Sequence, residues 1–155
     1  MRFTDAMPLI IEFEGGYVAD PRDPGGETNF GISKRAYPNE DIKNLTLSRV
    51  YELYKRDYWD AVKADALPAP VRFPVFDMAI NSGVRQAIKT LQKSVDAVQD
   101  GILGPNTMQA VWGVDPQRLV SRFLGNRLLF LTSLTTFTTF GRGWTKRVAE
   151  NLTRI

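Results

Sequence analysis

Apolar residues recur at intervals of three and four along most of this chain, and that spacing places them on one face of an α-helix. Glycine, proline and helix-capping residues interrupt the pattern where helices are expected to begin and end. The helices predicted in this way cover about residues 5–14, 47–54, 75–81, 84–98 and 105–112, then a long segment from 116 and a last one over 144–152. Residues 18–33 are instead rich in proline and glycine, which predicts a structured loop or small β-hairpin. The chain is therefore expected to be mainly α, with an irregular or β-hairpin loop after the first helix.

Two missing residue types restrict the chemistry that the chain can perform. It contains neither cysteine nor histidine. A cysteine nucleophile, a Ser-His-Asp triad and a zinc site with cysteine or histidine ligands are therefore excluded. An enzyme of this composition has to take its acids and bases from Asp, Glu, Lys and Tyr. With 155 residues, of which 43% are hydrophobic, the chain is long enough to bury a core of its own, and we expect a single globular domain.

The net charge of +3 is unevenly distributed along the chain. Residues 1–41 contain four Lys or Arg and eight Asp or Glu, a net charge of −4, whereas residues 118–155 contain seven Lys or Arg and one Glu, a net charge of +6. A basic segment of this kind favours an anionic partner such as an acidic glycan, a lipid surface or a nucleic acid. The alternative is a solvated basic face that only keeps the protein soluble.

Glu14 is an acidic residue in the middle of an apolar helical face. At 100° per residue it falls between Ile10 and Ile11 on the face that Met7 also shares, while Glu12 points away. A carboxyl at such a position is partly desolvated, which favours its protonated form and suits a general acid. The alternative is a structural role, in which Glu14 pairs with an arginine or caps the Gly-Gly turn that follows.

A second carboxylate, Asp23, follows Glu14 by nine residues, inside the proline- and glycine-rich loop. An acid at a helix end and a carboxylate in a loop suit glycoside hydrolysis, in which one group protonates the leaving oxygen and the other stabilises the cation or activates water. Asp20 and Asp23 each precede a proline, so turn formation also explains both. A calcium loop is a third reading, since Asp20, Asp23, Glu27 and Asn29 are oxygen ligands, but their spacing lacks the EF-hand pattern.

Several motifs together resemble a known family, glycoside hydrolase family 108, the phage and prophage N-acetylmuramidases. The specific part of the resemblance is the combination of Glu14-Gly15-Gly16-Tyr17 with Asp20-Pro21, Asp23-Pro24-Gly25-Gly26 and Thr28-Asn29-Phe30-Gly31-Ile32. It continues through Tyr58-Trp59, the run from Phe76 to Gly83, Leu91-Gln92, the run from Asp100 to Thr107 and Phe140-Gly141-Arg142-Gly143-Trp144. The resemblance therefore extends over nearly the whole chain.

The resemblance implies a lysozyme-like α-helical fold and cleavage of the β-1,4 bond between N-acetylmuramic acid and N-acetylglucosamine, with Glu14 as the essential acid. Phage-type lysozymes place an Asp nine residues after this Glu and a Thr fifteen residues after it. Asp23 matches the first interval, but this sequence has Thr28 at the fourteenth place and Asn29 at the fifteenth. The resemblance thus implies Glu14, Asp23 and Thr28 as catalytic residues.

Further residues of the motifs are expected to bind substrate. The residues with this expected role are Tyr17, Asn29, Gly31 and Asn81. The Asn81 side chain suits an N-acetyl group of the glycan, or else closes the turn at Gly83. Trp112 and Trp144 either stack on sugar rings or belong to the core.

The resemblance also divides the chain into two parts. Residues 1–83 match the catalytic part, and residues 84–155 resemble the predicted peptidoglycan-binding region that accompanies it, expected here to pack into the same lysozyme-like body. No metal or organic cofactor is implied. The expected partners are peptidoglycan glycan strands and, through the basic C-terminal stretch, an anionic cell envelope, with no nucleic acid and with the protein as a monomer.

The function expected from these observations is that of an endolysin-type lysozyme that degrades the bacterial cell wall and lyses the host. The sequence has no apolar run of membrane-spanning length and no pattern of a signal peptide. We therefore expect synthesis in the host cytoplasm and action in the periplasm after holin-type release. Two alternatives remain: a non-catalytic wall-binding or secretion-accessory protein, and a lytic transglycosylase that forms an anhydro product without water.

Overall fold

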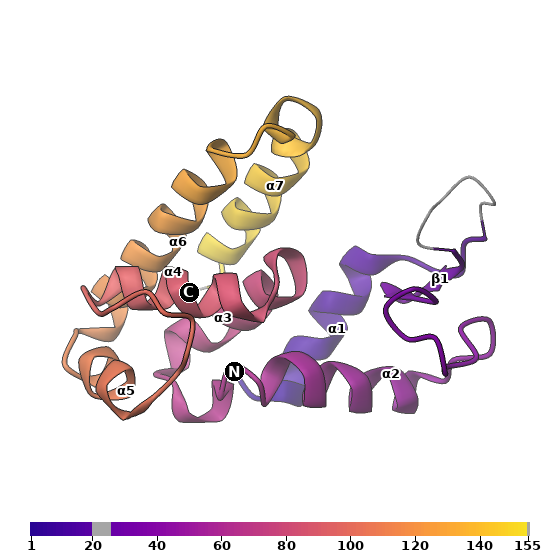
Figure 1. Ribbon diagram of the computed structural model, residues 1–155, viewed down its shortest axis with the longest axis horizontal. Coiled ribbons are helices and arrows are strands. Elements are labelled where there is room, and N and C mark those ends of the chain that lie inside the picture. Colours follow the sequence, from indigo (N-terminus) through magenta and orange to yellow (C-terminus); the bar gives the residue numbers. More distant parts are fainter. Residues whose placement is uncertain (20–25, 155) are drawn as a thin grey trace. The chain divides into compact units, whose positions relative to one another are not determined.

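The structure, a computed structural model, describes residues 1–19 and 26–154. Figure 1 shows a chain built almost entirely of helices, with one short hairpin near the N-terminal end of the sequence. The mainly α-helical class and the hairpin after the first helix are thus confirmed. The chain divides into two compact units, Arg2–Asp57 and Tyr58–Ile155. The expected division at residue 83, between a catalytic and a wall-binding part, remains a prediction.

The first unit contains two helices and the hairpin, with α1 at Phe3–Glu14, β1 at Thr28–Asn29, β2 at Ile32–Ser33 and α2 at Leu47–Tyr54. Helix α1 begins two residues before the expected start near Asp5. The reason is the pairing of Arg2 with Asp5 at its first turn: the Asp5 carboxylate accepts a hydrogen bond from the Arg2 backbone N–H at 2.9 Å and two from the Arg2 guanidinium. The Arg2 backbone N–H, which has no acceptor within the helix, thereby gains one in Asp5.

The hairpin pairs Thr28 with Ser33 and Asn29 with Ile32 in antiparallel register. Its two turn residues, Phe30 and Gly31, have φ values of 49° and 75°. Two successive positive φ angles are the requirement of the tightest hairpin turns, and glycine adopts them without steric strain.

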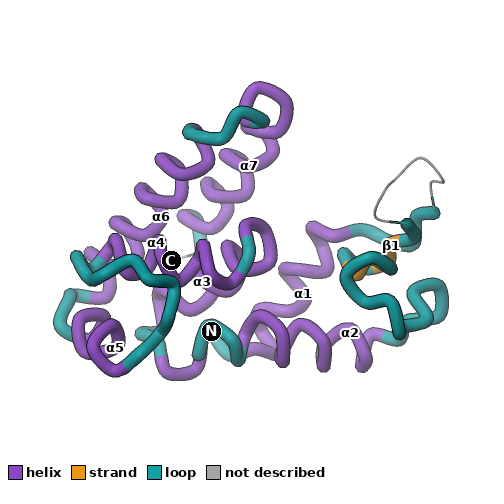
Figure 2. Tube along the Cα trace, viewed as in Figure 1, coloured by secondary structure: helices purple, strands orange, loops and turns teal. Residues whose placement is uncertain are grey.

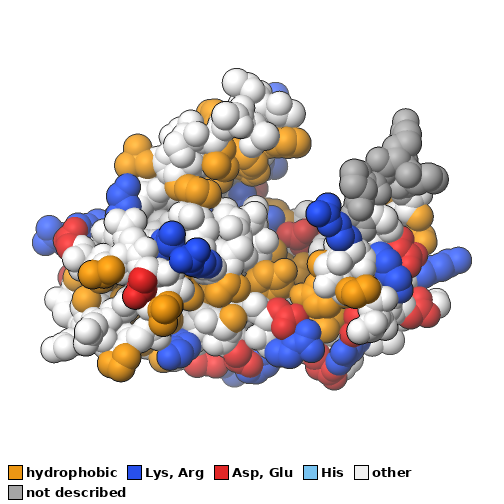
Figure 3. All heavy atoms as spheres, in the orientation of Figure 1, with side chains coloured by type: hydrophobic (Ala, Val, Ile, Leu, Met, Phe, Trp, Pro, Cys, Tyr) orange, Lys and Arg blue, Asp and Glu red, His pale blue; other side chains and the backbone are white. Residues whose placement is uncertain are grey.

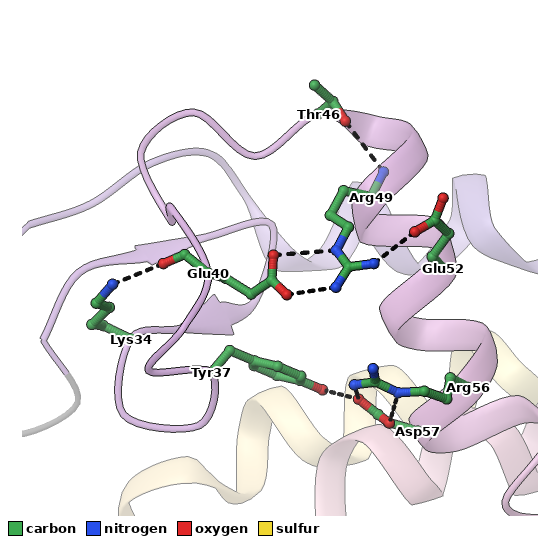
Figure 4. A network of polar contacts seen from close by, with 8 residues as sticks. All are labelled: Lys34, Tyr37, Glu40, Thr46, Arg49, Glu52, Arg56 and Asp57. Carbon is green, nitrogen blue, oxygen red and sulfur yellow. Dashed lines mark hydrogen bonds and ion pairs between the residues drawn. The ribbon is translucent and has the colours of Figure 1, made fainter.

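Helix α2 begins where the sequence predicts, because the Thr46 hydroxyl accepts a hydrogen bond from the Arg49 backbone N–H and so caps the first turn. Ion pairs join the loop before this helix to the helix itself (Figure 4). The Arg49 guanidinium donates two hydrogen bonds to Glu40, at 2.7 and 3.2 Å, and one to Glu52 at 2.7 Å. The Tyr37 hydroxyl donates to Asp57 at 2.9 Å. The loop that follows the hairpin is thus tied to α2 through Arg49 and to the segment directly after α2 through Asp57.

The second unit is helical throughout its regular structure, as Figure 2 shows. A π-helical segment, Lys55–Trp59, spans the division between the units, and a 3-10 turn follows at Ala64–Ala66. The remaining helices are α3 at Ala69–Ser82, α4 at Val84–Ser94, α5 at Pro105–Trp112, α6 at Pro116–Thr132 and α7 at Phe137–Leu152. Helix α6 starts as predicted, since Asp115 accepts a hydrogen bond from the Arg118 backbone N–H at 2.9 Å.

Besides α1, three helices differ from the sequence prediction in length. Helix α3 begins at Ala69 rather than near residue 75 and keeps Pro74 in its interior, where the pyrrolidine ring removes a backbone hydrogen bond. Helix α4 ends at Ser94, short of the predicted residue 98, because the chain turns at Asp96 with φ 56°. Helix α7 begins at Phe137 rather than near residue 144, and its Phe137 and Phe140 rings pack against Trp144. Packing against the rest of the unit favours helix in α3 and α7 despite weak local propensity.

A buried ion cluster joins α3, α6 and α7. Asp77 on α3 is fully buried and accepts hydrogen bonds from Arg127 at 2.7 Å, Arg147 at 2.8 Å and Asn151 at 3.2 Å. Burial lowers the pKa of the Arg127 guanidinium, and the Asp77 carboxylate acts in the opposite direction. Because a buried charge is tolerated only with such partners, this cluster fixes how the three helices pack.

The Asp-Gly turn between α4 and α5 is held by a buried glutamine. The Gln92 side-chain amide donates to Asp100 at 2.7 Å, and its carbonyl oxygen accepts from the Gly101 backbone N–H at 2.9 Å. The hydrogen bond from Gln92 lowers the pKa of the Asp100 carboxyl. The turn therefore has a defined conformation supported from inside the unit.

Candidate active site

Glu14 is the last residue of α1, and its surroundings follow the predicted helical face. Met7 and Ile10 are fully buried, Glu14 is half-buried and Glu12 is exposed. Gly15 follows with φ 70° and ends the helix. The carboxyl group thus lies at the end of an apolar face, at the point where that face meets solvent.

The hairpin turn brings a glycine against this carboxyl group. A Cβ atom placed on Gly31 would lie 2.6 Å from Glu14 Oε2 and 2.5 Å from the Tyr54 hydroxyl. A real side chain here would force one of these oxygen atoms to move, and the φ of 75° at this residue also favours glycine. Gly31 itself is exposed. Because Gly31 has no side chain, its backbone alone covers the side of the Glu14 carboxyl that faces the hairpin turn.

Tyr54, the last residue of α2, is a site residue that the sequence prediction treated only as part of an apolar helical face. Its ring is buried, and its hydroxyl donates a hydrogen bond to the Phe30 carbonyl oxygen at 3.0 Å. This bond anchors the hairpin turn to the end of α2. Because Gly31 directly follows Phe30, it also helps to place the Gly31 backbone next to Glu14. The signal available in the sequence was a tyrosine, rather than an aliphatic residue, at the end of a buried stripe.

Thr28 and Asn29, both predicted site residues, form β1. Thr28 pairs with Val18 through two backbone hydrogen bonds of 2.8 Å, and its side chain is half-buried. Asn29 is 5% exposed, and its side-chain amide donates to the Ile42 carbonyl oxygen at 3.0 Å. The structure thus shows Asn29 in contact with the loop that follows the hairpin, while its expected role in substrate binding stays a prediction.

Tyr17 lies beyond α1 and is exposed. Its hydroxyl donates a hydrogen bond to Glu27 Oε2 at 3.0 Å, which raises the pKa of the tyrosine. Glu27 immediately precedes β1, so the pair links the end of the helix to the start of the hairpin. Tyr17, Thr28, Asn29, Gly31 and Glu14 therefore all lie in the first unit, and Gly31 is the one among them shown next to the Glu14 carboxyl.

Two predicted residues are not related to this group by the structure. Asp23, expected to be the second carboxylate, lies in residues 20–25, outside the described residues, as does Asp20. Asn81 is exposed near the end of α3 in the second unit, where its amide donates to the Asp77 carbonyl oxygen at 3.2 Å. It lines a cavity of about 230 Å³ together with Trp144.

Trp112, the other tryptophan considered for sugar stacking, is 60% exposed and donates from its indole N–H to the Ala66 carbonyl oxygen at 3.1 Å.

Across residues 1–19 and 26–154, no group of three Asp, Glu, His or Cys side chains is placed to bind a metal ion. Among the helices of the same residues, none has both the length and the apolar character needed to cross a bilayer.

Comparison with known proteins gives two findings. The sequence model of the family described as Glycosyl hydrolase 108 matches residues 7–83, which include Glu14, Tyr54 and the whole hairpin. A solved structure, described as that of Brucella abortus SagA, matches with a TM-score of 0.88 and 41% sequence identity, covering 98% of this chain and 92% of that chain. No curated protein matches the sequence.

Proposed function

Because the chain belongs to glycosyl hydrolase family 108, we propose that it is an N-acetylmuramidase in which Glu14 is the general acid. Membership makes the chain a glycoside hydrolase that acts on peptidoglycan. Our proposal adds which bond is cleaved, namely the β-1,4 bond between N-acetylmuramic acid and N-acetylglucosamine. The observation that carries it is the half-buried Glu14 carboxyl, which lies against an exposed glycine.

A general acid has to hold its proton until the substrate arrives and then release it to the glycosidic oxygen. The Glu14 carboxyl lies at the end of the apolar face of α1, on the same face as the buried Met7 and Ile10. Gly31 lets the hairpin backbone approach this carboxyl closely, because a side chain there would meet Glu14 Oε2 and the Tyr54 hydroxyl. Glu14 thus combines a partly apolar environment with partial exposure to solvent.

The reaction needs a second group, and we assign it to Asp23. Glu14 gives its proton to the leaving oxygen as the bond to the anomeric carbon breaks, and the carboxylate stabilises the positive charge or takes a proton from the attacking water. Thr28, Tyr17 and Asn29 are proposed to position substrate or water. One hydrolysis consumes one water molecule, whose hydroxyl goes to the anomeric carbon. Its proton goes to Glu14 where Asp23 only stabilises the positive charge; where Asp23 takes it, exchange with solvent removes it from Asp23 and reprotonates Glu14.

The biological role that we propose is that of a phage or prophage endolysin, which is made in the cytoplasm and reaches the periplasm by holin-type release. The cationic character of the chain, with a net charge of +3, suits the anionic cell wall. A second role, limited opening of the wall by a resident bacterial enzyme, is favoured by the similarity to a protein of the bacterium Brucella abortus. Expression with and without a co-expressed holin separates the roles, because only an endolysin is expected to lyse the culture when the membrane is opened.

The catalytic proposal is tested by clearing of purified peptidoglycan with the wild type, Glu14→Gln and the control Glu12→Gln on the exposed face of the same helix. Loss of a positioned acid is expected to lower the rate by at least ~10²-fold in Glu14→Gln only. A Glu14→Gln variant that clears walls at the wild-type rate would remove Glu14 from the mechanism and favour another activity. Mass spectrometry of the released fragments is expected to find reducing ends; anhydro ends would identify a transglycosylase instead.

The role of Asp23 is tested against its neighbour Asp20, which also precedes a proline. Asp23→Ala is expected to lose ~10²-fold or more in wall hydrolysis, whereas Asp20→Ala is expected to stay near wild type. Equal activity of the two variants would exclude Asp23 as the second carboxylate.

A further inference from the structure

Helices α6 and α7 pack against each other within the second unit, and a short turn at residues 133–136 connects them. Figure 1 shows this turn beyond α3, α4 and α5 of the same unit. We call residues 128–146, which comprise the last residues of α6, the turn and the first residues of α7, the hairpin end. Because it projects from the other helices of the second unit, it can approach a flat partner without hindrance from them.

The hairpin end exposes two large apolar side chains to water. Leu129 is 63% exposed and Phe140 is 54% exposed. Leu129 lies three residues before the end of α6 and Phe140 three residues after the start of α7, so each lies about 4.5 Å from the helix end at a rise of ~1.5 Å per residue. Two apolar side chains at the same depth suit a partner with an apolar layer, because burial in that layer removes both from water.

The polar residues around these two side chains carry hydroxyl groups and no charges. Residues 128–141 contain no Asp, Glu, Lys or Arg, and Figure 3 shows mainly hydrophobic and uncharged groups at this end. The Thr132 and Ser133 hydroxyls donate hydrogen bonds to backbone carbonyl oxygens at 3.0 and 2.7 Å, so these two donors are satisfied without water. Such a surface costs much less free energy to desolvate than a charged one. The exposed residues with a hydroxyl group are Thr132, Ser133, Thr135, Thr136, Thr138 and Thr139.

The charged side chains of the two helices near the hairpin end are all basic. Residues 116–149 contain six Lys or Arg and no Asp or Glu. Three of the six form ion pairs with Asp77 or Asp96. A surface of this charge favours an anionic partner. The remaining three basic residues are exposed: Arg118, Arg142 and Lys146.

Two of these cations follow Phe140 on α7. Along the helix axis, Arg142 lies about 3 Å and Lys146 about 9 Å beyond Phe140. The headgroup layer on each side of a bilayer is about 5–7 Å thick, and long basic side chains extend toward it while their stems cover apolar surface. When Phe140 lies at the boundary between acyl chains and headgroups, Arg142 is therefore level with the lipid phosphates and Lys146 reaches them from outside. The Lys146 ammonium is 3.8 Å from Glu150 at an exposed site, so that pair competes only weakly with a phosphate.

We propose that the hairpin end docks on an anionic lipid bilayer, with Leu129 and Phe140 at the boundary between headgroups and acyl chains and with Arg142 and Lys146 on the lipid phosphates. Apolar insertion combined with basic charge is what holds peripheral proteins on membranes. The inference goes beyond the proposed function, since no step of bond cleavage depends on it. It gives the second unit a partner other than the cell wall.

Charge disfavours a second copy of the chain as the partner. A symmetric contact places the same patch of both copies face to face, so Arg142 and Lys146 of one copy would approach those of the other. Like charges brought together in this way weaken an interface. An anionic bilayer instead provides an apolar layer and negative charge at the depths where the hairpin end has apolar and basic side chains.

The first test is co-sedimentation of the full-length protein with vesicles of phosphatidylcholine and phosphatidylglycerol. Leu129→Gln combined with Phe140→Gln is expected to weaken binding about tenfold at every salt concentration, because salt does not screen apolar transfer. Val98→Gln combined with Ile102→Gln is the matched control, since these side chains are 81% and 67% exposed and lie outside the hairpin end. The control is expected to bind as the wild type. No binding of the wild type, or equal binding of the two double variants, would overturn the proposal.

The second test measures insertion directly with a tryptophan probe. Phe140→Trp keeps a large aromatic side chain, and Ile102→Trp places the same probe at an exposed residue elsewhere in the second unit. In vesicles whose acyl chains carry bromine, the added fluorescence of Phe140→Trp is expected to be quenched and that of Ile102→Trp to stay unchanged. Absence of quenching in Phe140→Trp would overturn the proposal even if the double glutamine variant failed to fold.

A third measurement distinguishes the bilayer from a second copy. Sedimentation velocity of the wild type without vesicles is expected to find no self-association that depends on Leu129 or Phe140. Self-association that Leu129→Gln with Phe140→Gln abolishes, in a protein that does not bind vesicles, would assign the hairpin end to a second copy and overturn the proposal. Thermal unfolding of each variant shows that a loss of binding is not a loss of folding.

Discussion

Gly31 determines how closely the hairpin backbone approaches the Glu14 carboxyl. Its position combines a φ of 75° with two oxygen atoms where a Cβ would be, one from Glu14 and one from Tyr54. A residue of this kind has a role in the site because it lacks a side chain. From the sequence, Gly31 was expected to contact substrate. The structure adds a second role that the sequence did not indicate, which is to leave room for the Glu14 and Tyr54 oxygen atoms.

Gly31→Ala is expected to destabilise the protein by ~1–3 kcal/mol, because an alanine at this φ is strained and its methyl group displaces the Glu14 carboxyl. Displacement of a catalytic group by about 1 Å is expected to lower wall hydrolysis by ~10²-fold. Gly16→Ala is the control, since no atom lies within 4 Å of its added Cβ. Thermal unfolding and wall clearing measured on both variants check the prediction, and wild-type activity of Gly31→Ala would show that the carboxyl does not need this close approach.

At the scale of elements, ion pairs of two kinds connect helices to their surroundings. Those around α2, shown in Figure 4, are partly exposed to water, whereas the cluster at Asp77 is buried. Exposed pairs contribute little to stability, because water and salt screen them. Removal of one partner from a buried pair is costly, because the other charge is then left in an apolar environment.

The buried cluster gives the larger expected effect. Asp77→Asn is expected to lower the free energy of unfolding by ~3–5 kcal/mol, since Arg127 and Arg147 would then lose their charged partner. Asp96→Asn, which breaks the exposed pair with Arg122, is expected to cost less than ~1 kcal/mol. Urea unfolding of both variants is the measurement. Similar losses in the two variants would contradict a structural role specific to the buried cluster.

The partly exposed pair of Glu40 and Arg49 gives the stability of the protein a pH dependence with a defined sign. Hydrogen bonds from Arg49 lower the pKa of Glu40 below its ordinary value of 4.5. The folded state therefore holds this proton less tightly than the unfolded state, so the stabilisation is present above pH 4.5 and is lost as the pH falls through the folded pKa. Glu40→Gln is expected to reduce the dependence of stability on pH between about pH 5 and 3. The prediction is tested by measuring the urea unfolding midpoint across this pH range, with Glu12→Gln as control. If the midpoints of wild type and Glu40→Gln change in parallel with pH, the Glu40–Arg49 pair does not contribute to the pH dependence of stability.

At the scale of the whole molecule, the structure changes how the basic C-terminal stretch is understood. Two of its seven cations, Arg127 and Arg147, bind Asp77 inside the second unit rather than facing a partner. On the face shown in Figure 3, lysine and arginine side chains are interspersed with aspartate and glutamate. The count of charges along the sequence therefore overstates the charge available to an anionic envelope.

The exposed residues Arg142 and Lys146 remain available for such an envelope. Their joint substitution by glutamine is expected to weaken binding to anionic vesicles at low salt, with the difference from wild type shrinking as salt rises, because screening acts within ~8 Å at physiological ionic strength. Arg35→Gln with Lys43→Gln changes the net charge equally in the first unit and serves as control. Vesicle co-sedimentation measures binding, and equal loss in both double variants would mean that net charge alone, rather than this stretch, drives association.

The sequence by itself determined what local rules control. Helical periodicity and the caps at Thr46 and Asp115 predicted the starts of α2 and α6, because a cap acts within three residues of its own position. The placement of Glu14 on an apolar face followed from the same periodicity, and the family followed from motifs that lie within short segments. These properties depend on neighbours in the chain, so they can be derived without the fold.

Tertiary structure decided the features that depend on residues far apart in the chain. Helix α3 extends through Pro74, and Arg147 lies beside Asp77, 70 residues away. Gly31 reaches Glu14 and Tyr54 only because a hairpin and two helix ends meet. None of these contacts has a signature in local sequence, since burial and ion pairing at long range depend on which faces pack together. The physical reason is that propensity acts over a few residues, whereas packing and desolvation act on whatever the fold brings into contact.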